Sequence, residues 1–290
     1  MSERVAILGL GAMGGPVAVA VSGAGYEITG FDPAPGARQR AAAAGVAVAD
    51  DAAAAVSKAD VVVVSVPKPE HVLALADGDL LQATAGTVVV DLSTIDPDTA
   101  RAAAERLAAQ DIVYLDCPVL GRPAGCGGWT LVAGGGEEDV TRVSPLLEAT
   151  IARRVVRIGD VGAGSVVKIL NNLMFGAINA VTAEALHLCQ RNGIDREAFV
   201  DAVVDSGAAT VSNLFRDIGP RIVADDHDPV FALDLLAKDN RLAAALAAAG
   251  GTAAPVSEAV GRVNEAAVAL GHGALDSSAV IRAYDDGALA

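Results

Sequence analysis

The chain has 290 residues, 52% of them hydrophobic and only 3% aromatic, and its 36 acidic and 21 basic side chains give a formal net charge of −15. This hydrophobic content excludes intrinsic disorder, and the length allows one large domain or two ordinary ones. The negative charge argues against nucleic acid and anionic membranes as partners. The longest strongly apolar run, Val61–Val66, is far too short to span a bilayer.

Cysteine usage and the first residues bear on the compartment. The opening segment shows no separate apolar stretch followed by a small-residue cleavage site. The three cysteines, Cys117, Cys126 and Cys189, are odd in number and lack metal-ligand spacing, which suits a reducing environment. We therefore expect a cytoplasmic protein without a metal site.

In the first half of the chain, short Val- and Ile-rich runs alternate with longer Ala-rich segments of helical period. Continuously apolar strands are typical of a sheet buried on both faces, and strand–helix alternation predicts a mostly parallel sheet. The predicted strands are Arg4–Leu8, Glu27–Phe31, Val61–Val66, Val88–Asp91, Ile112–Asp116, Thr130–Ala133 and Arg154–Ile158. The clearest helices between them are Pro97–Gln110 and Glu137–Ala149.

After about Gly159 the strand signals end and helical patterns replace them. The predicted helices are Ser165–Asn192, Asp195–Ser206, Ala232–Ala249, Pro255–Leu270 and Ser277–Asp285. We expect an α/β domain over residues 1–160 and an all-helical domain over residues 161–290, with the long helix leading from one into the other.

A glycine-rich turn follows the first predicted strand and opens a helix. Gly9-Leu10-Gly11-Ala12-Met13-Gly14 fits G-x-G-x-x-G in the context that gives this pattern meaning. Gly9 would permit the tight turn, Gly11 the approach of a pyrophosphate and Gly14 a close helix–strand contact. The helix N-terminus would hold the phosphates. The pattern predicts a doubly wound, Rossmann-type dinucleotide-binding domain; a purely structural turn is the alternative.

The residue that ends the second predicted strand indicates which dinucleotide binds. Asp32 lies about 20 residues after Gly14, where an acidic residue hydrogen-bonds the adenosine ribose. A carboxylate there repels a 2′-phosphate, and the following Pro33 offers no cation to offset it. The sequence therefore favours NAD over NADP.

The long helix begins with a lysine and two asparagines on one face. Lys168 lies three residues before Asn171 and four before Asn172, so the ammonium and an amide are neighbours. The helix macrodipole disfavours positive charge near the N-terminus, and burial acts in the same direction. Lys168 is thus expected to exchange a proton near neutral pH. An ordinary surface lysine is the alternative.

Six motifs, in order and nearly end to end, resemble the β-hydroxyacid dehydrogenases, which include 3-hydroxyisobutyrate dehydrogenase and tartronate semialdehyde reductase and are similar to 6-phosphogluconate dehydrogenases. The motifs are GLGAMG, VVVVSVPKPEHV, DLSTIDP, DCPVLGRPAGCGGWTLVAGG, GAGSVVKILNN and FALDLLAKDNRLA. Together they are far more specific than any one alone.

The resemblance implies hydride transfer between NAD(H) and a small β-hydroxy acid or related semialdehyde. It implies that Lys168 exchanges the proton and that Asn172 orients Lys168. Asp239 is expected to hold its helix in place. The resemblance places the substrate beside Ser93, Leu120, Gly121, Arg122 and Asn171. It places the cofactor beside Gly9, Gly11, Ala12, Met13, Gly14, Asp32, Val66, Pro67, Thr94 and, from the helical domain, Lys238.

One segment departs from the family. The usual Ser-Gly-Gly, which cradles the substrate carboxylate, is replaced here by Leu120-Gly121-Arg122. A hydroxyl is lost and a guanidinium appears. Arg122 either contacts the substrate anion, as a bidentate clamp, or points into solvent with a substrate that is no simple hydroxy acid.

Two other functions remain open: an imine reductase on the same fold, against which the retained Lys168 counts, and a non-catalytic dinucleotide-binding protein. The four histidines are scattered along the chain and predict no acid–base pair. The long Ala-rich helix and the apolar helical domain predict a homodimer or homotetramer.

Overall fold

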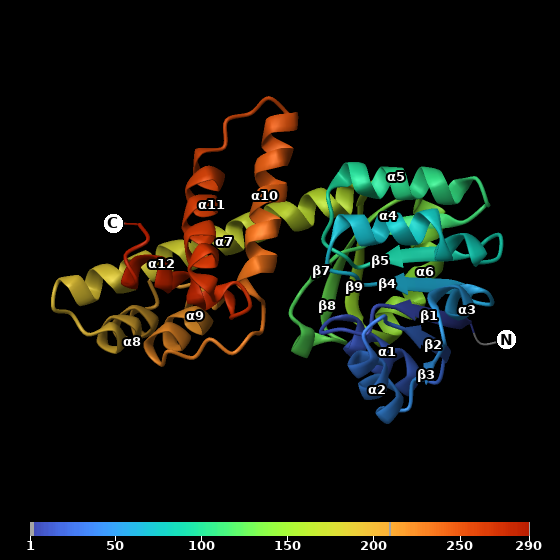
Figure 1. Ribbon diagram of the computed structural model, residues 1–290, viewed down its shortest axis with the longest axis horizontal. Coiled ribbons are helices and arrows are strands. Elements are labelled where there is room, and N and C mark those ends of the chain that lie inside the picture. Colours follow the sequence, from blue (N-terminus) through green and yellow to red (C-terminus); the bar gives the residue numbers. More distant parts are fainter. Residues whose placement is uncertain (1–2, 209, 290) are drawn as a thin grey trace. The chain divides into compact units, whose positions relative to one another are not determined.

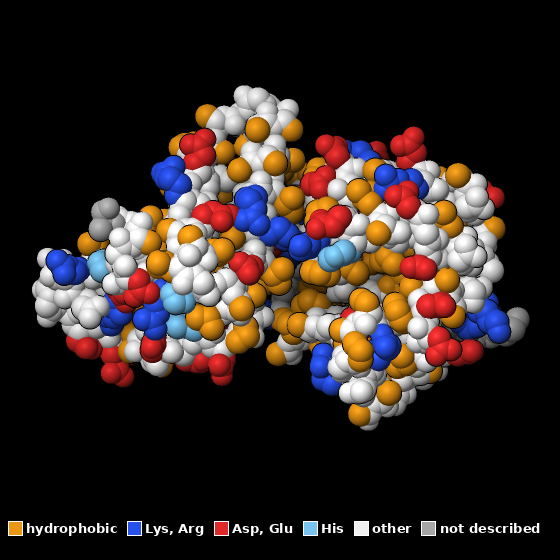
Figure 2. All heavy atoms as spheres, viewed as in Figure 1, with side chains coloured by type: hydrophobic (Ala, Val, Ile, Leu, Met, Phe, Trp, Pro, Cys, Tyr) orange, Lys and Arg blue, Asp and Glu red, His pale blue; other side chains and the backbone are white. Residues whose placement is uncertain are grey.

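The structure is a computed structural model that describes residues 3–208 and 210–289. It divides into two compact units, one running to Lys168 and the other starting at Ile169 (Figure 1). The division falls inside one continuous helix, α7 (Ala163–Arg191). Acidic side chains are scattered over the face of each unit seen in Figure 2, as the net charge of −15 predicts.

The first unit is built on a nine-stranded sheet in the order β3-β2-β1-β4-β5-β6-β8-β7, with β9 paired to β8. All pairs are parallel except those of β8 with β6 and β7. The strands are β1 (Arg4–Leu8), β2 (Glu27–Phe31), β3 (Ala47–Val48), β4 (Val61–Val64), β5 (Val88–Asp91), β6 (Val113–Asp116), β7 (Val119–Leu120), β8 (Trp129–Gly134) and β9 (Ala152–Gly159).

Helices cover both faces of this sheet. Successive side chains of a strand point to opposite faces, so Val61 and Val63 join one buried cluster while Val62 and Val64 join the other. The first cluster includes α1 (Gly14–Gly23), α2 (Pro35–Ala43) and α6 (Glu137–Thr150). The second includes α3 (Ala52–Val56), α4 (Pro69–Asp77) and α5 (Pro97–Ala108). Short 3₁₀ turns span Asp79–Gln82 and Pro123–Gly125.

The described residues of the second unit form helices joined by loops, and their strand-like pairing is limited to one isolated bridge between Ala232 and Asp276. Its core includes Leu186 of α7, Ile218 of α9 and Leu233 of α10. Besides α7 it contains α8 (Arg196–Ser206), α9 (Asn213–Val223), α10 (Leu233–Ala249), α11 (Pro255–Ala267) with a π-helical turn (Val268–His272), a 3₁₀ turn (Ser277–Ile281) and α12 (Arg282–Asp285).

The predicted fold class is confirmed, while several elements differ from prediction. The strand after Val61 stops at Val64, and the two-residue strands β3 and β7 were not predicted because so short a run carries no periodicity. Helix α9 was missed because Gly-Pro at 219–220 predicts a break, yet buried Ile218 and Ile222 hold the helix together. The segment Ser277–Asp285 is a 3₁₀ turn followed by a short helix.

Candidate active site

The glycine turn between β1 and α1 has the geometry that its sequence predicts. Gly9 has φ +95°, and a Cβ there would lie 2.1 Å from the carbonyl oxygen of Ser65. A Cβ on Gly14 would lie 1.8 Å from the carbonyl oxygen of Gly9. No heavy atom of the described chain lies within 4 Å of a Cβ built on Gly11. The outer glycines are therefore required by the fold, whereas the middle one faces space that a ligand can enter.

A cavity of about 330 Å³ adjoins this open position. Its lining includes Gly11 and Ala12 from the turn, Pro16 and Val19 from α1, and Arg40 from α2. The first N–H groups of a helix lack intrahelical acceptors, and they carry the positive end of the macrodipole. Amide donors, open space and a nearby guanidinium fit the phosphates of a dinucleotide.

Asp32 ties the end of β2 to the glycine turn. Its Oδ2 accepts the N–H of Leu10 at 2.8 Å and its Oδ1 accepts the N–H of Ala34 at 2.8 Å. Arg38 folds back onto the same strand end: its Nη1 donates to the carbonyl oxygen of Asp32 at 2.5 Å, and its Cζ lies 5.7 Å from the Phe31 ring centroid. A carboxylate and a guanidinium thus lie together at this strand end.

The ends of β4 and β5 are joined by a serine. Ser93 Oγ accepts the N–H of Val66 at 2.9 Å, which brings together two of the predicted site residues from different strands. The N–H of Ser93 donates to Oδ1 of Asp91 at 2.8 Å, and the Tyr114 hydroxyl donates to Oδ2 of Asp91 at 2.6 Å. Burial raises the pKa of Asp91. Pro67 and Thr94 directly follow the joined residues.

Asp116, which the sequence did not single out, holds the start of α7. It lies at the end of β6, is 1% exposed, and accepts the N–H of Gly162 on Oδ1 and that of Ser165 on Oδ2, each at 2.7 Å. Burial raises the pKa of Asp116 to about 6 in spite of these hydrogen bonds. Its role could not be found in the sequence because its partners lie 46 and 49 residues away.

Lys168 lies one turn beyond this capped helix start. Its Nζ donates to the carbonyl oxygen of Val119 at 2.7 Å. Val119 belongs to β7, and Leu120, Gly121 and Arg122 follow it directly. The predicted proton-transferring group and the predicted substrate loop are therefore brought together within the first unit.

The cysteines beside this loop are not activated as nucleophiles. Cys117 is 1% exposed, and burial raises the pKa of its thiol; burial also raises the pKa of Cys126. The thiolate is the reactive form, so neither thiol is activated near neutral pH.

In the helical unit a polar chain links α7 to α10. Asn172 Nδ2 donates to Oδ2 of Asp239 at 2.5 Å, and Asn171 Nδ2 donates to Oδ1 of Asn172 at 3.1 Å. Lys238 Nζ lies 2.9 Å from Oδ1 of Asp239. Asn172 and Asp239 are buried, while Asn171 is exposed. Asp239 thus fastens its own helix to α7.

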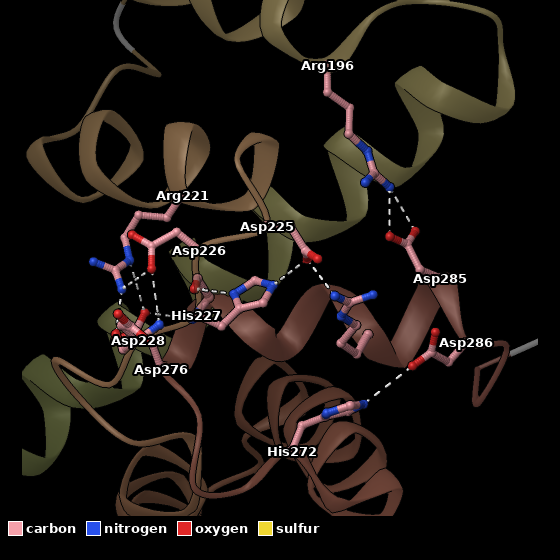
Figure 3. A network of polar contacts seen from close by, with 12 residues as sticks. Arg196, Arg221, Asp225, Asp226, His227, Asp228, His272, Asp276, Asp285 and Asp286 are labelled. Atoms are coloured by element: carbon pink, nitrogen blue, oxygen red, sulfur yellow. Dashed lines mark hydrogen bonds and ion pairs between the residues drawn. The ribbon is translucent and has the colours of Figure 1, made fainter.

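The histidines of the helical unit contact acids or hydroxyls of its C-terminal segment. Figure 3 shows one of them, His272, beside Asp286. His187 lies 2.7 Å from Asp285, and His272 lies 3.3 Å from Asp286. His227 Nδ1 lies 2.8 Å from the Ser278 hydroxyl. Arg196 also pairs with Asp285 at 2.7 Å. These contacts stabilise the end of the unit, and within residues 3–208 and 210–289 no group of three or more His, Cys, Asp or Glu could hold a metal ion.

The fold and the glycine turn define a nucleotide-binding oxidoreductase. Residues 4–159 match the family model of the NAD binding domain of 6-phosphogluconate dehydrogenase, and residues 162–284 match that of the NAD-binding domain of NADP-dependent 3-hydroxyisobutyrate dehydrogenase. The chain belongs to the β-hydroxyacid dehydrogenase family and is an NAD(P)-dependent dehydrogenase.

Full-length relatives support this assignment. An L-threonate dehydrogenase of Cupriavidus necator is 36% identical over 98% of this chain and 97% of its own length. A 3-hydroxyisobutyrate dehydrogenase of Pseudomonas aeruginosa is 37% identical over 87% of this chain and 88% of its own. The structure of Mycobacterium tuberculosis 3-hydroxyisobutyrate dehydrogenase with L-serine has a TM-score of 0.87 at 33% identity, covering 98% and 99% of the two chains. An imine reductase from Pseudomonas sp., at 20% identity and TM-score 0.62, shares the fold.

Proposed function

We propose that the protein oxidises a small β-hydroxy acid, or reduces the corresponding semialdehyde, with Lys168 as the proton-transferring group. The observation that carries this proposal is the 2.7 Å hydrogen bond from Lys168 Nζ to the carbonyl oxygen of Val119. It fixes the end of a flexible side chain beside the loop that begins at Leu120. A lysine in bulk water would have no such orientation.

The hydrogen bond to Val119 leaves the amine ready for either direction of reaction. A neutral amine has two N–H donors and one lone pair; with one N–H on the carbonyl, the lone pair can accept the substrate's hydroxyl proton. The resulting ammonium keeps the same hydrogen bond and can return a proton to a carbonyl oxygen. The nicotinamide, when bound, supplies the hydride chemistry.

Asn172 is proposed to orient the reacting groups. It lies four residues beyond Lys168 in α7, a spacing that puts two side chains on one helix face. Its Nδ2 donates a hydrogen bond to Asp239, and this hydrogen bond fixes the orientation of the side-chain amide. Asn171 donates to the Oδ1 of Asn172 and is the more exposed member of the pair.

We propose the same roles for the remaining site residues as the sequence predicts. We assign Ser93, Leu120, Gly121, Arg122 and Asn171 to the substrate, and Gly9, Gly11, Ala12, Met13, Gly14, Asp32, Val66, Pro67, Thr94 and Lys238 to the cofactor. Support comes from the open space beside Gly11 and from the Ser93–Val66 hydrogen bond. The hydrogen bonds that Asp32 accepts from the glycine turn support its place in the cofactor set.

A substrate panel tests the proposed reaction. NADH formation should be measured with NAD and the acids that occur in the relatives' names: 3-hydroxyisobutyrate, L-threonate, L-serine and 2-(hydroxymethyl)glutarate. We expect turnover with at least one acid and none with a cyclic imine in the reductive direction. Imine reduction without acid oxidation would favour the imine reductase alternative, and no turnover at all would favour a non-catalytic nucleotide binder.

Arg122 is proposed to bind the substrate's carboxylate, a role that the family usually gives to the serine at the position of Leu120. Its backbone lies two residues after β7, whose carbonyl holds Lys168. A guanidinium can bind a carboxylate through two parallel hydrogen bonds. Arg122→Ala should therefore raise KM about tenfold for the best acid of the panel. An unchanged KM would rule out the clamp.

We infer a preference for NAD over NADP, supported by the carboxylate of Asp32 beside the glycine turn. Removing its charge while keeping an acceptor oxygen should weaken discrimination against a 2′-phosphate, since Arg38 lies at the same strand end. Asp32→Asn is expected to lower the NAD-to-NADP ratio of kcat/KM about tenfold or more. Asp50→Asn, an exposed acid nearby in sequence, is the control. A ratio that stays at the wild-type value would contradict the assignment.

A homodimer or homotetramer is proposed from the surface of α7. Met174, Val181 and Leu188 recur every seven residues and are 66%, 61% and 51% exposed. Such a stripe on one helix face is typical of helix–helix association. A monomeric mass in analytical ultracentrifugation would contradict this proposal.

We infer that the protein works in the cytoplasm and not in a membrane. By length and composition α7 could span a bilayer, but core helices of other proteins pass the same test. Polar Asn172, Asn179 and Thr182 are buried along it, which suits a core helix. The cysteines are free, as in a reducing compartment. Recovery of the protein in a membrane fraction would contradict this inference.

A further inference from the structure

The segment that joins β7 to β8 is fastened to a single tryptophan. Trp129 is the first residue of β8 and is only 1% exposed. Its Nε1 donates to the carbonyl oxygen of Arg122 at 2.7 Å. The same oxygen accepts the N–H of Gly125 at 2.9 Å. The indole N–H is thus one of two donors that fix the peptide group of Arg122.

The residue before Arg122 lies against the same indole, at its Cδ1 corner. A Cβ on Gly121 would lie 2.3 Å from Cδ1 and 3.0 Å from Nε1 of Trp129. No side chain fits there unless the ring moves. Arg122 is therefore restrained on both sides, by ring contact at Gly121 and by the hydrogen bond at its own carbonyl.

The other end of this segment carries the partner of Lys168. Val119 pairs with Leu131 in the β7–β8 ladder, and its carbonyl accepts Lys168 Nζ. Arg122 lies three Cα-to-Cα steps after Val119, a span of at most about 10 Å. The arginine side chain can cover part of that span, so an acid whose hydroxyl lies at Lys168 can place its carboxylate at the guanidinium.

We propose that Trp129 is a positioning residue for substrate binding, because it holds the backbone of Arg122 at a fixed distance from Lys168. This rests on the proposed function, in which Arg122 binds the carboxylate. A loop held in one conformation before binding loses less conformational entropy when the substrate arrives. The tryptophan therefore acts on substrate affinity and leaves proton transfer at Lys168 unchanged.

The test separates the N–H from the ring. Trp129→Phe keeps a buried aromatic ring and removes the donor, together with part of the ring volume. We expect KM for the best acid of the panel to rise about fivefold, with kcat within about twofold of wild type and the NADH dissociation constant unchanged. A variant that was merely less well folded would lose kcat and NADH binding as well.

The chain has one tryptophan, so its fluorescence reports on this loop alone. Gly121→Ala must displace the ring; we expect a red-shifted emission together with a rise in KM larger than that of Trp129→Phe. If Trp129→Phe fails to fold, Gly121→Ala carries the test. Unchanged emission or unchanged KM in Gly121→Ala would overturn the proposal, as would an unchanged KM in a folded Trp129→Phe.

Failure of this inference can be distinguished from failure of the proposed function. A raised KM in Arg122→Ala with an unchanged KM in Trp129→Phe would leave the anion contact standing and remove the role of the tryptophan. An unchanged KM in Arg122→Ala would remove the anion contact, and the tryptophan proposal would fall with it.

Discussion

Replacing Lys168 with alanine should lower kcat by about 10²–10⁴-fold, the range that a positioned acid–base group contributes. The NADH dissociation constant should stay within about twofold of wild type, because the substitution leaves unchanged the glycine turn and Asp32, which we propose bind the phosphates and the ribose. Steady-state kinetics with the best acid of the panel, together with NADH titration, measure the two quantities separately.

Two controls sharpen this experiment. Lys58→Ala removes an exposed lysine of the same unit and should leave kcat unchanged. Adding methylamine to Lys168→Ala should restore part of the turnover, since a small amine can enter the space that the side chain leaves. Turnover of Lys168→Ala at the wild-type level would show that another group transfers the proton.

Asp116→Asn should alter the pH dependence of the unfolding free energy, and it should also lower kcat. Burial raises the pKa of Asp116 from 3.8 to about 6 in the folded protein. Between pH 4 and 6 the folded state therefore holds a proton that the unfolded state has lost, so the stability from this group is present below pH 4 and is lost as pH rises through 6. The loss amounts to about 3 kcal/mol.

The difference in unfolding free energy between wild type and Asp116→Asn should accordingly shift by about 3 kcal/mol in favour of the variant from pH 4 to pH 7.5. Urea unfolding followed by tryptophan fluorescence measures it at each pH. Asp98→Asn, whose side chain is 87% exposed, is the control and should show no such shift. A pH-independent difference would show that burial does not hold the proton on Asp116.

The same substitution should lower kcat about tenfold at neutral pH. The amide keeps one acceptor oxygen, but its NH₂ cannot accept the second of the two N–H groups, so the start of α7 would move with Lys168. If both results are found, the ionised Asp116 carboxylate lowers the unfolding free energy of the protein but holds the start of α7, the helix that carries Lys168. An unchanged kcat would show that the hydrogen bonds of Asp116 to the start of α7 do not determine the position of Lys168.

Much of this site could be predicted from local sequence. The glycine turn with Asp32 predicts a dinucleotide site because its chemistry lies within one strand–turn–helix–strand unit. Lys168 and Asn172 share a helix face, so their spacing alone makes them neighbours. The sequence did not predict the hydrogen bonds that Tyr114 donates to Asp91 and Trp129 donates to the carbonyl oxygen of Arg122.

The sequence by itself determined the Rossmann-type order of strands and helices, the glycine turn and the lysine on the long helix, because each depends on residues close together along the chain. Only the tertiary structure decided that Asp116 caps α7, that Val119 receives the ammonium of Lys168 and that the indole holds Arg122. The caps on α7 and the lysine contact join residues 46 to 49 positions apart, and the indole contact depends on how β8 packs in the sheet. No pattern of spacing or periodicity reports contacts of that kind, since they follow from which strands lie side by side.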